Sequence, residues 1–314
     1  MERKEIVSTV IVSMNKLDNL RICLPSIRRY TKILNRVYVI AYLFSPDNLK
    51  KLREEFDWIT IIESNEIRGF AENNNLALRD INTKYIFILN DDTEFKVSVI
   101  DNLVNAMNNT LDATVMSPVL FRGDGSLQFN GRRYYSFWNF FLRQIGVKHF
   151  PRSMYENGSG IYQSYNISGA AFLIKTDVFR NVGFFDEKYF FCPEDIALST
   201  LLNKQGYKCY VDATTPITHY EGVSSKKTKL FFATTISAFL GSSYFYCTSK
   251  FQRNILLILW KLKYVTFLFL SQIYNNNSRY ADFAYIYNKV ELCFRKNISC
   301  KEIFIKEYRK VSNQ

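Results

Sequence analysis

Three polar residues follow a buried-strand pattern in the first half of the chain. Tyr85 to Leu89 is a short apolar run typical of a buried strand, and Asn90, Asp91 and Asp92 come directly after it. Open α/β folds bind ligands at the carboxyl edge of their parallel strands. Oxygen ligands clustered there suit Mg²⁺ or Mn²⁺, which would hold a diphosphate. The other interpretation is a strand-end turn, because Asn and Asp favour turns on their own account.

A glycine and a run of asparagines mark a second candidate binding turn, between Asn65 and Leu78. Gly69, at the step from strand to helix, would let the backbone approach a ligand, and the side chains of Asn73 to Asn75 could reach back towards it. The same residues also fit a helix N-terminus with ordinary Asn capping.

Two acids open a predicted helix later in the chain, after an aromatic lead-in at Phe190 and Phe191. Pro193 followed by Glu194 and Asp195 is good helix-start chemistry whatever the function. An apolar lead-in also keeps a carboxylate partly desolvated, which lifts its pKa towards the working range of a general base.

His219 is one of only two histidines and follows a predicted strand by a few residues. A neutral imidazole is a common transition-metal ligand and fits Mn²⁺ acceptably, so His219 could complete a site begun by Asp92. A lone histidine is also a frequent structural residue.

These candidates are placed by an alternation of strand and helix patterns. The alternation predicts a parallel sheet covered on both faces, and we expect Pro25 to kink the first helix. The predicted strands are 6–13, 37–43, 58–62 and 85–89, and the predicted helices are 17–30, 48–55, 71–80 and 97–108.

The alternation breaks after Pro118. Residues 122–160 are rich in Gly, aromatic and basic residues and predict a long irregular excursion, of a length that is usually functional or mobile. Regular structure is predicted again in the strand 168–174, the helix 195–204 and the strand 207–212.

Charge divides the chain into two parts. It has 314 residues, 47% of them hydrophobic, which is enough for one large domain or two modest ones. The net charge of +12 is uneven, since residues 226–314 carry 15 Lys and Arg against 4 Asp and Glu, while residues 1–225 carry 26 against 25. The second part is therefore a basic segment with its own role. Six cysteines without a Cys-x-x-Cys pair, and an N-terminus without a signal-peptide pattern, predict a reduced cytosolic protein.

The basic segment contains two long apolar helical patterns, 230–246 and 255–273. The 12 Leu, Ile, Val and Phe residues of the second would favour membrane insertion by about 4 to 7 kcal/mol. Lys261 and Lys263 near its middle would oppose insertion by about 5 to 7 kcal/mol. Because these contributions nearly cancel, we expect this helix to pack on the protein or to lie in a membrane interface rather than span it.

Together the segments resemble an inverting family 2 glycosyltransferase of the GT-A type, with a rhamnosyltransferase-like metal motif. The match covers about residues 6–225 in the right order. It includes the first strand at Thr9 to Asn15, the turn Gly69-Phe70-Ala71 with Asn74-Asn75, the metal motif Asn90 to Thr93, the acceptor-side segments Ser168 to Ala170 and Val182 to Glu187, the pair Glu194-Asp195, and the late His219.

The patterns and the resemblance predict an α/β, Rossmann-like GT-A fold with a mostly parallel central sheet and a C-terminal helical, basic, membrane-associating segment. The catalytic domain would cover residues 1–225, with a nucleotide-sugar half at about 1–118 and an acceptor half at about 119–225. Residues 226–314 would form the helical basic region.

The resemblance also implies a reaction and the residues that perform it. A sugar would pass with inversion from a UDP- or dTDP-linked donor to a hydroxyl of a growing, lipid-linked cell-surface glycan. Asp195 would be the catalytic base, and Asp92 and His219 would hold Mn²⁺ or Mg²⁺, with Asn90 contributing through water. The expected donor contacts are Ser13, Asn15, Asn65, Gly69, Asn75, Asn90 and Asp91, and the expected acceptor contacts are Ser168, Gly169 and Glu194.

Three positions depart from the family pattern. The Asp that usually ends the second strand beside the nucleobase is replaced by Leu43-Phe44-Ser45, with Asp47 a few residues late. Met14 replaces a common Tyr, and Ala197 replaces a frequent second Asp after the Glu-Asp pair. The departures concern the nucleobase contacts, whereas the diphosphate and catalytic-base positions match.

The basic segment suits an acceptor at a membrane, because each Lys or Arg near an anionic leaflet contributes about 1 kcal/mol. We therefore expect a cytoplasmic, peripheral protein at the inner face of the cell membrane, with a homodimer left open. A nucleic-acid partner is not expected, since no RNA- or DNA-binding motif accompanies the charge.

Two other functions would use part of the same residue pattern. The alternative is a non-catalytic sugar-nucleotide-binding or membrane-associated partner protein of the same fold, which the presence of both Asp92 and Asp195 disfavours. A nucleotidyltransferase would normally show a Gly-rich phosphate loop near the N-terminus, and the sequence has none there.

Overall fold

The computed structural model describes residues 5–128, 130–147, 160–220, 230–274 and 278–312. Contacts divide the chain into two compact units, which we call the sheet unit and the helical unit. The sheet unit comprises Met1–Tyr134, Pro151–Asp186 and Glu194–Val223, and the helical unit comprises Tyr135–Phe150, Glu187–Pro193 and Ser224–Gln314.

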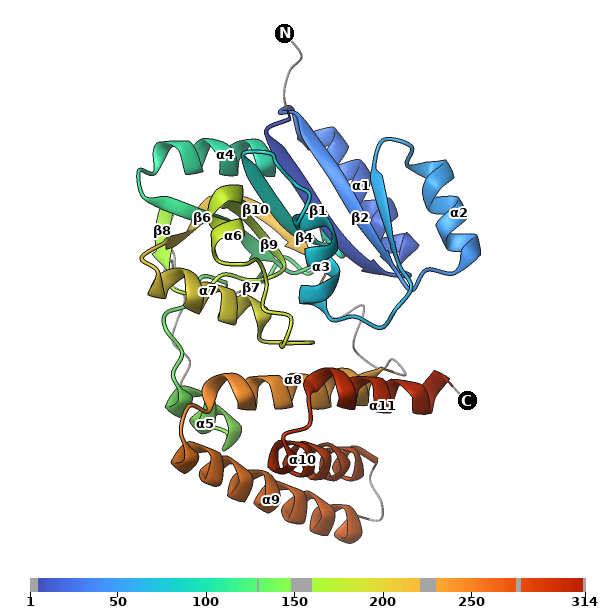
Figure 1. The fold of residues 1–314 in the computed structure, drawn as a ribbon, viewed down its shortest axis with the longest axis vertical. Coiled ribbons are helices and arrows are strands. Elements are labelled where there is room, and N and C mark those ends of the chain that lie inside the picture. The colour runs from blue at the N-terminus through green and yellow to red at the C-terminus, as the bar shows by residue number, and fades with distance from the viewer. Residues whose placement is uncertain (1–4, 129, 148–159, 221–229, 275–277, 313–314) are drawn as a thin grey trace. The chain divides into compact units, whose positions relative to one another are not determined.

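The first half of the sheet unit is the predicted alternation of parallel strands and helices (Figure 1). Strand β1 pairs in parallel with both β2 and β4, and β2 pairs in parallel with β3. The predicted parallel sheet is therefore confirmed here. The elements are β1 (Val7–Met14), α1 (Leu17–Tyr30), β2 (Asn35–Tyr42), α2 (Pro46–Glu55), β3 (Thr60–Ser64), α3 (Phe70–Leu78), β4 (Tyr85–Asn90), β5 (Thr93–Glu94) and α4 (Val99–Asn109).

The second half of the sheet unit adds an antiparallel strand that the alternation did not indicate. Strand β9 runs antiparallel between β4 and β6, and β10 then pairs in parallel with β6. The whole sheet has the order β3-β2-β1-β4-β9-β6-β10-β5. These elements are β6 (Ala113–Phe121), β7 (Leu127–Gln128), β8 (Ile161–Ser164), β9 (Ala171–Lys175), α6 (Thr176–Asn181), α7 (Glu194–Lys204) and β10 (Lys208–His219).

The pairing registers bring three chain segments to one edge of the sheet. The end of β4 lies beside the start of β9, where Leu89 pairs with Ala171. The end of β10 lies beside β5, where His219 pairs with Thr93. Residues that follow β4, precede β9 and end β10 therefore meet at the same edge.

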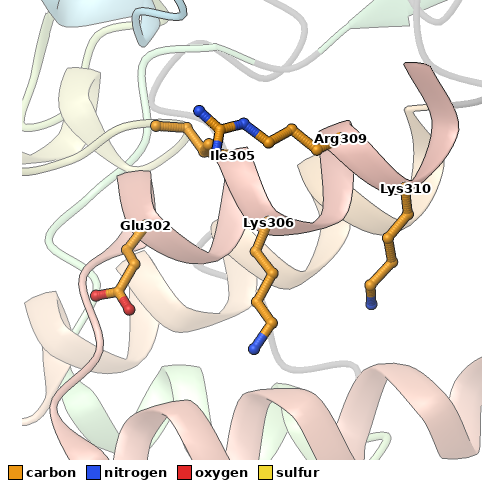
Figure 2. A pocket seen from close by; sticks show the side chains of 5 residues that line it. All are labelled: Glu302, Ile305, Lys306, Arg309 and Lys310. Carbon is orange, nitrogen blue, oxygen red and sulfur yellow. The ribbon is translucent and has the colours of Figure 1, made fainter. Parts of the chain in front are cut away.

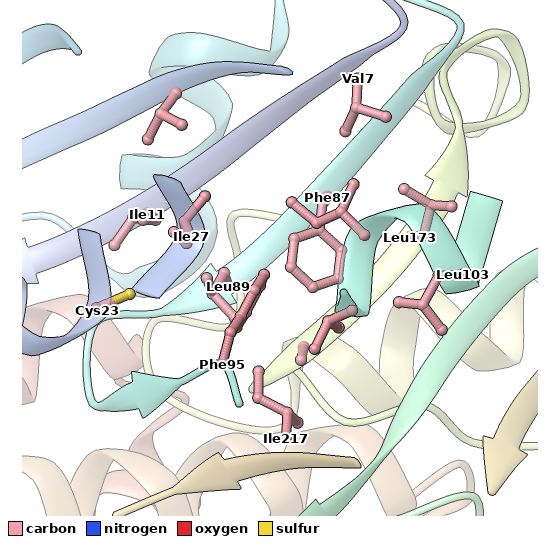
Figure 3. Packing of buried hydrophobic residues seen from close by; sticks show 14 of the residues in the cluster. Val7, Ile11, Cys23, Ile27, Phe87, Leu89, Phe95, Leu103, Leu173 and Ile217 are labelled. Atoms are coloured by element: carbon pink, nitrogen blue, oxygen red, sulfur yellow. The ribbon is translucent and has the colours of Figure 1, made fainter. Parts of the chain in front are cut away.

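Apolar side chains on both faces of the sheet fix this arrangement. Phe87 and Leu89 of β4 pack with α1 and α4 on one face (Figure 3), whereas Ile86 and Ile88 pack with α3, α6 and α7 on the other. All four side chains are at most 1% exposed. Since burying such a side chain contributes about 1.5 to 3 kcal/mol, β4 is a strongly held platform for the residues that follow it.

The helical unit is built around aromatic contacts. Trp260 is fully buried and stacks on Tyr287 with ring centroids 5.7 Å apart, and Phe190 packs on Phe304 at 4.6 Å. Its helices are α5 (Phe137–Gln144), α8 (Phe231–Tyr246), α9 (Lys250–Ile273), α10 (Ser278–Lys296) and α11 (Cys300–Ser312).

Several predicted boundaries differ from the structure. The excursion predicted at 122–160 contains β7 and α5, while its residues 148–159 lie outside the described residues. The helix predicted at 255–273 begins earlier, because the Ser249 hydroxyl accepts a hydrogen bond from the backbone N–H of Gln252 and caps α9. Helix α1 continues through Pro25 to Tyr30.

Candidate active site

Asp92 and His219 meet where β4 and β10 end. Asp92 Oδ1 lies 3.1 Å from His219 Nε2, and the two side chains are only 10% and 8% exposed. The backbone N–H of Tyr220 donates to the Asp92 carbonyl at 2.9 Å, which fixes the turn that carries the carboxylate. The two residues predicted to share a cation are thus brought together, 127 positions apart in sequence.

The contacts of His219 define which ring nitrogen carries the proton. Its Nδ1 lies 2.8 Å from Gln128 Oε1, and because an amide oxygen can only accept, Nδ1 must donate. The Asn90 amide nitrogen lies 3.4 Å from Nε2, so it donates at most a long, weak hydrogen bond to that atom. In the neutral ring, the Nε2 lone pair therefore faces the Asp92 carboxylate.

Two electron-pair donors that face each other repel unless a cation or a proton lies between them. Neighbouring ligands of an octahedral Mg²⁺ with bonds of 2.0–2.1 Å lie about 2.9 Å apart, close to the separation of Asp92 and His219. Metal-bound histidines typically donate their second N–H to a protein acceptor, as His219 does to Gln128. The donor set therefore fits a divalent cation.

No larger cluster of acidic, His and Cys side chains suited to a metal is present within the described residues. A site with few protein ligands is usual for Mg²⁺ that binds substrate phosphates, which supply the remaining oxygens.

Asp91 points away from this pair and into the protein. Its Oδ2 accepts a hydrogen bond from the Ser13 hydroxyl at 2.6 Å, and its Oδ1 accepts one from the Asn19 amide at 3.2 Å. Burial raises the pKa of Asp91 to about 6, against the opposing effect of the Ser13 hydrogen bond. Asp91 therefore joins the turn after β4 to the end of β1 and to α1.

Asp195, the predicted base, lies in the first turn of α7. Its Oδ2 accepts a hydrogen bond from the backbone N–H of Gly169 at 3.0 Å, and its Oδ1 accepts one from the N–H of Ile196 at 2.7 Å. Burial raises the pKa of Asp195, while these backbone donors and the positive charge of Arg132 oppose the rise. Asp195 is nevertheless partly exposed. A general base needs such exposure, because its carboxylate must reach the substrate.

The segment Gly169-Ala170 connects the predicted base to the predicted metal motif. Gly169 donates to Asp195, and the adjacent Ala170 carbonyl accepts a hydrogen bond from the backbone N–H of Asn90 at 2.9 Å. A Cβ atom on Gly169 would also lie 3.7 Å from the ring of Phe70, at the start of α3. Three motifs that are far apart in sequence therefore adjoin one another.

The predicted donor contacts on the first three strands lie at the same edge of the sheet. Asn15 follows β1 in a left-handed conformation with φ of 53°, and its Oδ1 accepts hydrogen bonds from the Ser45 N–H and the Asn48 amide. Asn65 follows β3 and is exposed. Gly69 caps α3 and its N–H donates to the Glu72 carboxylate at 3.4 Å.

The amide of Asn75 is used within the protein. Its Nδ2 donates to the Phe185 carbonyl at 3.0 Å, its Oδ1 accepts from the Phe185 N–H at 3.3 Å, and the side chain is 3% exposed. Asp47, which stands near the position of the family's strand-end Asp, lies in the first turn of α2. As donor contacts, all of these residues stay predictions.

The predicted acceptor contacts lie next to Asp195 or to its hydrogen-bond partner Gly169 in the chain. The Ser168 hydroxyl accepts a hydrogen bond from the Ala170 N–H at 3.3 Å, which shapes the turn before β9. Glu194 opens α7 next to Asp195 and is buried.

Gln128 is the site residue that the sequence analysis did not identify. It lies in a two-residue strand within the segment predicted to be irregular, and 91 positions separate it from His219. A single glutamine in a segment without a regular sequence pattern has no neighbour that would mark it as a site residue.

A cavity of about 490 Å³ lies elsewhere, along α11 in the helical unit (Figure 2). Glu302, Ile305, Lys306, Arg309 and Lys310 line it. None of the predicted site residues is among them.

Comparisons with known proteins identify the family and the fold of the chain. Residues 8–183 match the family model described as glycosyl transferase family 2. An N-acetylglucosaminyl-diphospho-decaprenol L-rhamnosyltransferase, found in the CDC 1551 / Oshkosh and H37Rv strains of Mycobacterium tuberculosis, is 23% identical over 151 residues, which are 45% of this chain and 48% of that protein. The chain thus spans about half the length of these curated relatives.

Two solved structures share the fold. The crystal structure of GalNAc-T7 with UDP, GalNAc and Mn²⁺ has a TM-score of 0.58 and 16% identity, over 95% of this chain and 57% of that one. The mannosyltransferase PcManGT from Pyrobaculum calidifontis, in complex with GDP-Man and Mn²⁺, has a TM-score of 0.50 and 14% identity, over 99% and 88%. At these identities the likeness concerns the fold, and the expected GT-A fold is confirmed.

Proposed function

Because the chain belongs to glycosyl transferase family 2, we propose that it transfers a sugar, with inversion, from a UDP- or dTDP-linked donor to a hydroxyl of a growing, lipid-linked cell-surface glycan. The observation that carries the proposal is that the candidate metal ligands and the candidate base adjoin at one edge of the sheet. The pair Asp92–His219 and the carboxylate of Asp195 adjoin through Gly169-Ala170, whose backbone bonds to both Asp195 and Asn90.

The transfer is proposed to depend on Mn²⁺ or Mg²⁺, held by Asp92 and His219 with Asn90 contributing through water. The facing lone pairs of Asp92 and His219 support this assignment, as does the Mn²⁺ in the GalNAc-T7 and PcManGT structures. A divalent cation bound there would act as a Lewis acid on the leaving diphosphate. Gln128 would keep the His219 ring in the tautomer that leaves Nε2 free to bind.

Asp195 would act as the general base. Its carboxylate would take the proton of the acceptor hydroxyl while the acceptor oxygen attacks the anomeric carbon. The bond from that carbon to the donor phosphate breaks, and the electron pair leaves with the nucleoside diphosphate. One base suffices, since no glycosyl-enzyme intermediate forms, and burial moves the pKa of Asp195 towards the range a base needs.

The donor would lie along the carboxyl ends of β1, β3 and β4. Within the proposal Asn15, Asn65, Gly69 and Asn90 provide direct contacts. Ser13, Asp91 and Asn75 would act mainly by position, because their side chains are buried as well as hydrogen-bonded within the protein.

The acceptor would approach the base from the side of Ser168, Gly169 and Glu194. The name of the mycobacterial relative supports two parts of this proposal. Its decaprenol-linked substrate supports a lipid-linked acceptor, and its description as an L-rhamnosyltransferase supports a rhamnosyl donor. A cytoplasmic, peripheral location at the inner membrane face would suit such an acceptor, as would the basic character of residues 226–314.

Asp195→Asn tests the base assignment. The variant should bind a nucleotide sugar as the wild type does, because it leaves Asp92 and His219 unchanged, yet lose nearly all transfer. Binding is measured by calorimetry with Mn²⁺ and a panel of UDP- and dTDP-sugars, and transfer by release of the nucleoside diphosphate. Turnover at the wild-type rate would show that another group is the base.

A further inference from the structure

Helix α9 exposes an apolar stripe on the face opposite the one it buries. Leu256 and Trp260 are fully buried in the helical unit. On the other side, six large apolar side chains recur every three, four or seven residues, which places them along one line of the helix. We call them the apolar stripe; they are Phe251, Ile258, Leu262, Val265, Phe269 and Ile273, each between 52% and 64% exposed.

The stripe is too long and continuous to be an incidental surface feature. It spans the 23 residues from Phe251 to Ile273, or about 33 Å at a rise of 1.5 Å per residue. By length and composition, α9 is also the one helix among those described that could cross a membrane. Exposed apolar patches of this extent usually mark a protein–protein or membrane contact.

Two contacts on the inner side of α9 hold it against the helical unit. Arg253 donates to the Asn297 side chain at 2.8 Å and also contacts the Phe294 carbonyl. The Lys263 ammonium lies 4.7 Å from the centre of the Tyr287 ring and 3.3 Å from its hydroxyl. A helix tied in this way to its neighbour suits a position along a bilayer surface better than one across it.

The charge of α9 has one sign. The helix contains four Lys and Arg residues and no Asp or Glu. Lys250 and Lys261 are exposed, and helical geometry places both along one border of the stripe. An apolar face bordered by lysines is typical of helices that lie in the headgroup layer of anionic membranes.

A small cavity lined in part by charged side chains adjoins this border. It has a volume of about 160 Å³ and is lined by Lys261 and Tyr264 of α9 and by Asn288, Glu291 and Arg295 of α10. Glu291 forms an ion pair with Arg295. Lys261 therefore leaves the cavity with a net positive charge, next to the stripe, as a phosphate headgroup would require.

We propose that α9 docks on an anionic phospholipid bilayer, with the apolar stripe inserted at the headgroup boundary and a headgroup phosphate at the Lys261 cavity. The inference rests on the proposed membrane location and is independent of the transfer chemistry. A second copy of the chain is a poorer occupant, because a two-fold contact would set identical, acid-free helices with their lysines against each other.

Vesicle flotation of the full chain tests the proposal. The wild type should float with vesicles containing phosphatidylglycerol, and high salt should reduce this binding. Leu262→Gln with Phe269→Gln should lower the partition coefficient about 30-fold, because both side chains would insert. Lys261→Gln should lower it about fivefold on anionic vesicles and leave it unchanged on phosphatidylcholine alone.

A matched control removes exposed apolar side chains from the sheet unit. Ile22 and Leu111 are 49% and 100% exposed, and Ile22→Gln with Leu111→Gln should float as the wild type does. Hydrolysis of the donor by water, measured in parallel without vesicles, should be equal in all variants. Loss of hydrolysis in the wild type would contradict the proposed function and not the docking surface.

Three results would overturn the docking proposal. The first is a wild type that does not bind anionic vesicles although it hydrolyses donor normally. The second is a Leu262→Gln, Phe269→Gln variant that floats as strongly as the wild type. The third is the same variant being a monomer in light scattering where the wild type is a dimer, with vesicle binding unchanged, which would show that a second copy covers the stripe.

Discussion

Replacing Gln128 by leucine tests how the cation site is organised without touching a proposed ligand. The Gln128 side chain accepts the His219 Nδ1 proton at 2.8 Å, and this is the contact that leaves Nε2 facing Asp92. Without it, the Nε2–H tautomer would donate to Asp92 and block the position of the cation. Loss of such a supporting partner costs about 10- to 100-fold in metal affinity, or about 1.4 to 2.7 kcal/mol.

A carboxylate at the same position should act in the opposite direction. Gln128→Glu supplies a stronger acceptor for the Nδ1 proton and makes the ring a better ligand, so Mn²⁺ affinity at pH 8 should equal or exceed that of the wild type.

Calorimetric titration with Mn²⁺ in the presence of UDP measures both effects, and electron paramagnetic resonance of free Mn²⁺ checks them without a nucleotide. Gln163→Leu is the matched control, since Gln163 is an exposed glutamine on β8 of the same unit. Wild-type Mn²⁺ affinity in Gln128→Leu, with intact thermal unfolding, would refute the assigned tautomer and the cation site built on it.

Three further predictions follow from the site and its supports. Burial raises the pKa of Asp195. The pH profile of kcat/KM should therefore rise with pH with an apparent pKa above the value of about 4 that is usual for an Asp. An apparent pKa at the usual value would contradict a buried base. Asp92→Ala should abolish Mn²⁺-dependent nucleotide binding in calorimetry. A titration identical to that of the wild type would contradict the assignment of Asp92 as a metal ligand. Asn75→Ala leaves the buried N–H and C=O of Phe185 without their side-chain partner. The free energy of unfolding measured in urea should therefore fall by about 2 to 4 kcal/mol. A fall below about 0.5 kcal/mol would show that these hydrogen bonds are not maintained in solution.

The sheet up to β4 could be predicted because its signals are local. Each strand is a short apolar run, and α1 buries Leu20, Cys23, Leu24 and Ile27 at helical spacing. The position of the candidate metal motif could be predicted for the same reason, since Asn90 to Asp92 stand at the end of a short apolar strand.

The insertion of β9 could not be predicted, because strand direction depends on distant partners. Residues 171–175 form a strand pattern of either orientation, and only pairing with both β4 and β6 makes it antiparallel. That reversal is what brings Gly169 and Ala170, which directly precede β9, beside Asn90.

The inward roles of Asp91 and Asn75 were hidden for a related reason. Both are polar residues in a motif that the sequence associates with ligand binding, yet one bonds to Ser13 and the other to Phe185, 78 and 110 positions away. A sequence pattern shows which residues lie near a site, whereas the direction of each side chain depends on the tertiary partners.

The most direct test of the account is a crystal structure of the full chain carrying Asp195→Asn, grown with Mn²⁺ and an unreacted nucleotide sugar. We predict that Mn²⁺ is bound by Asp92 Oδ1 and His219 Nε2 and contacts the diphosphate, with the anomeric carbon between the cation and residue 195. A nucleotide sugar bound with its diphosphate away from Asp92, or with residue 195 on a surface that the sugar does not reach, would contradict it.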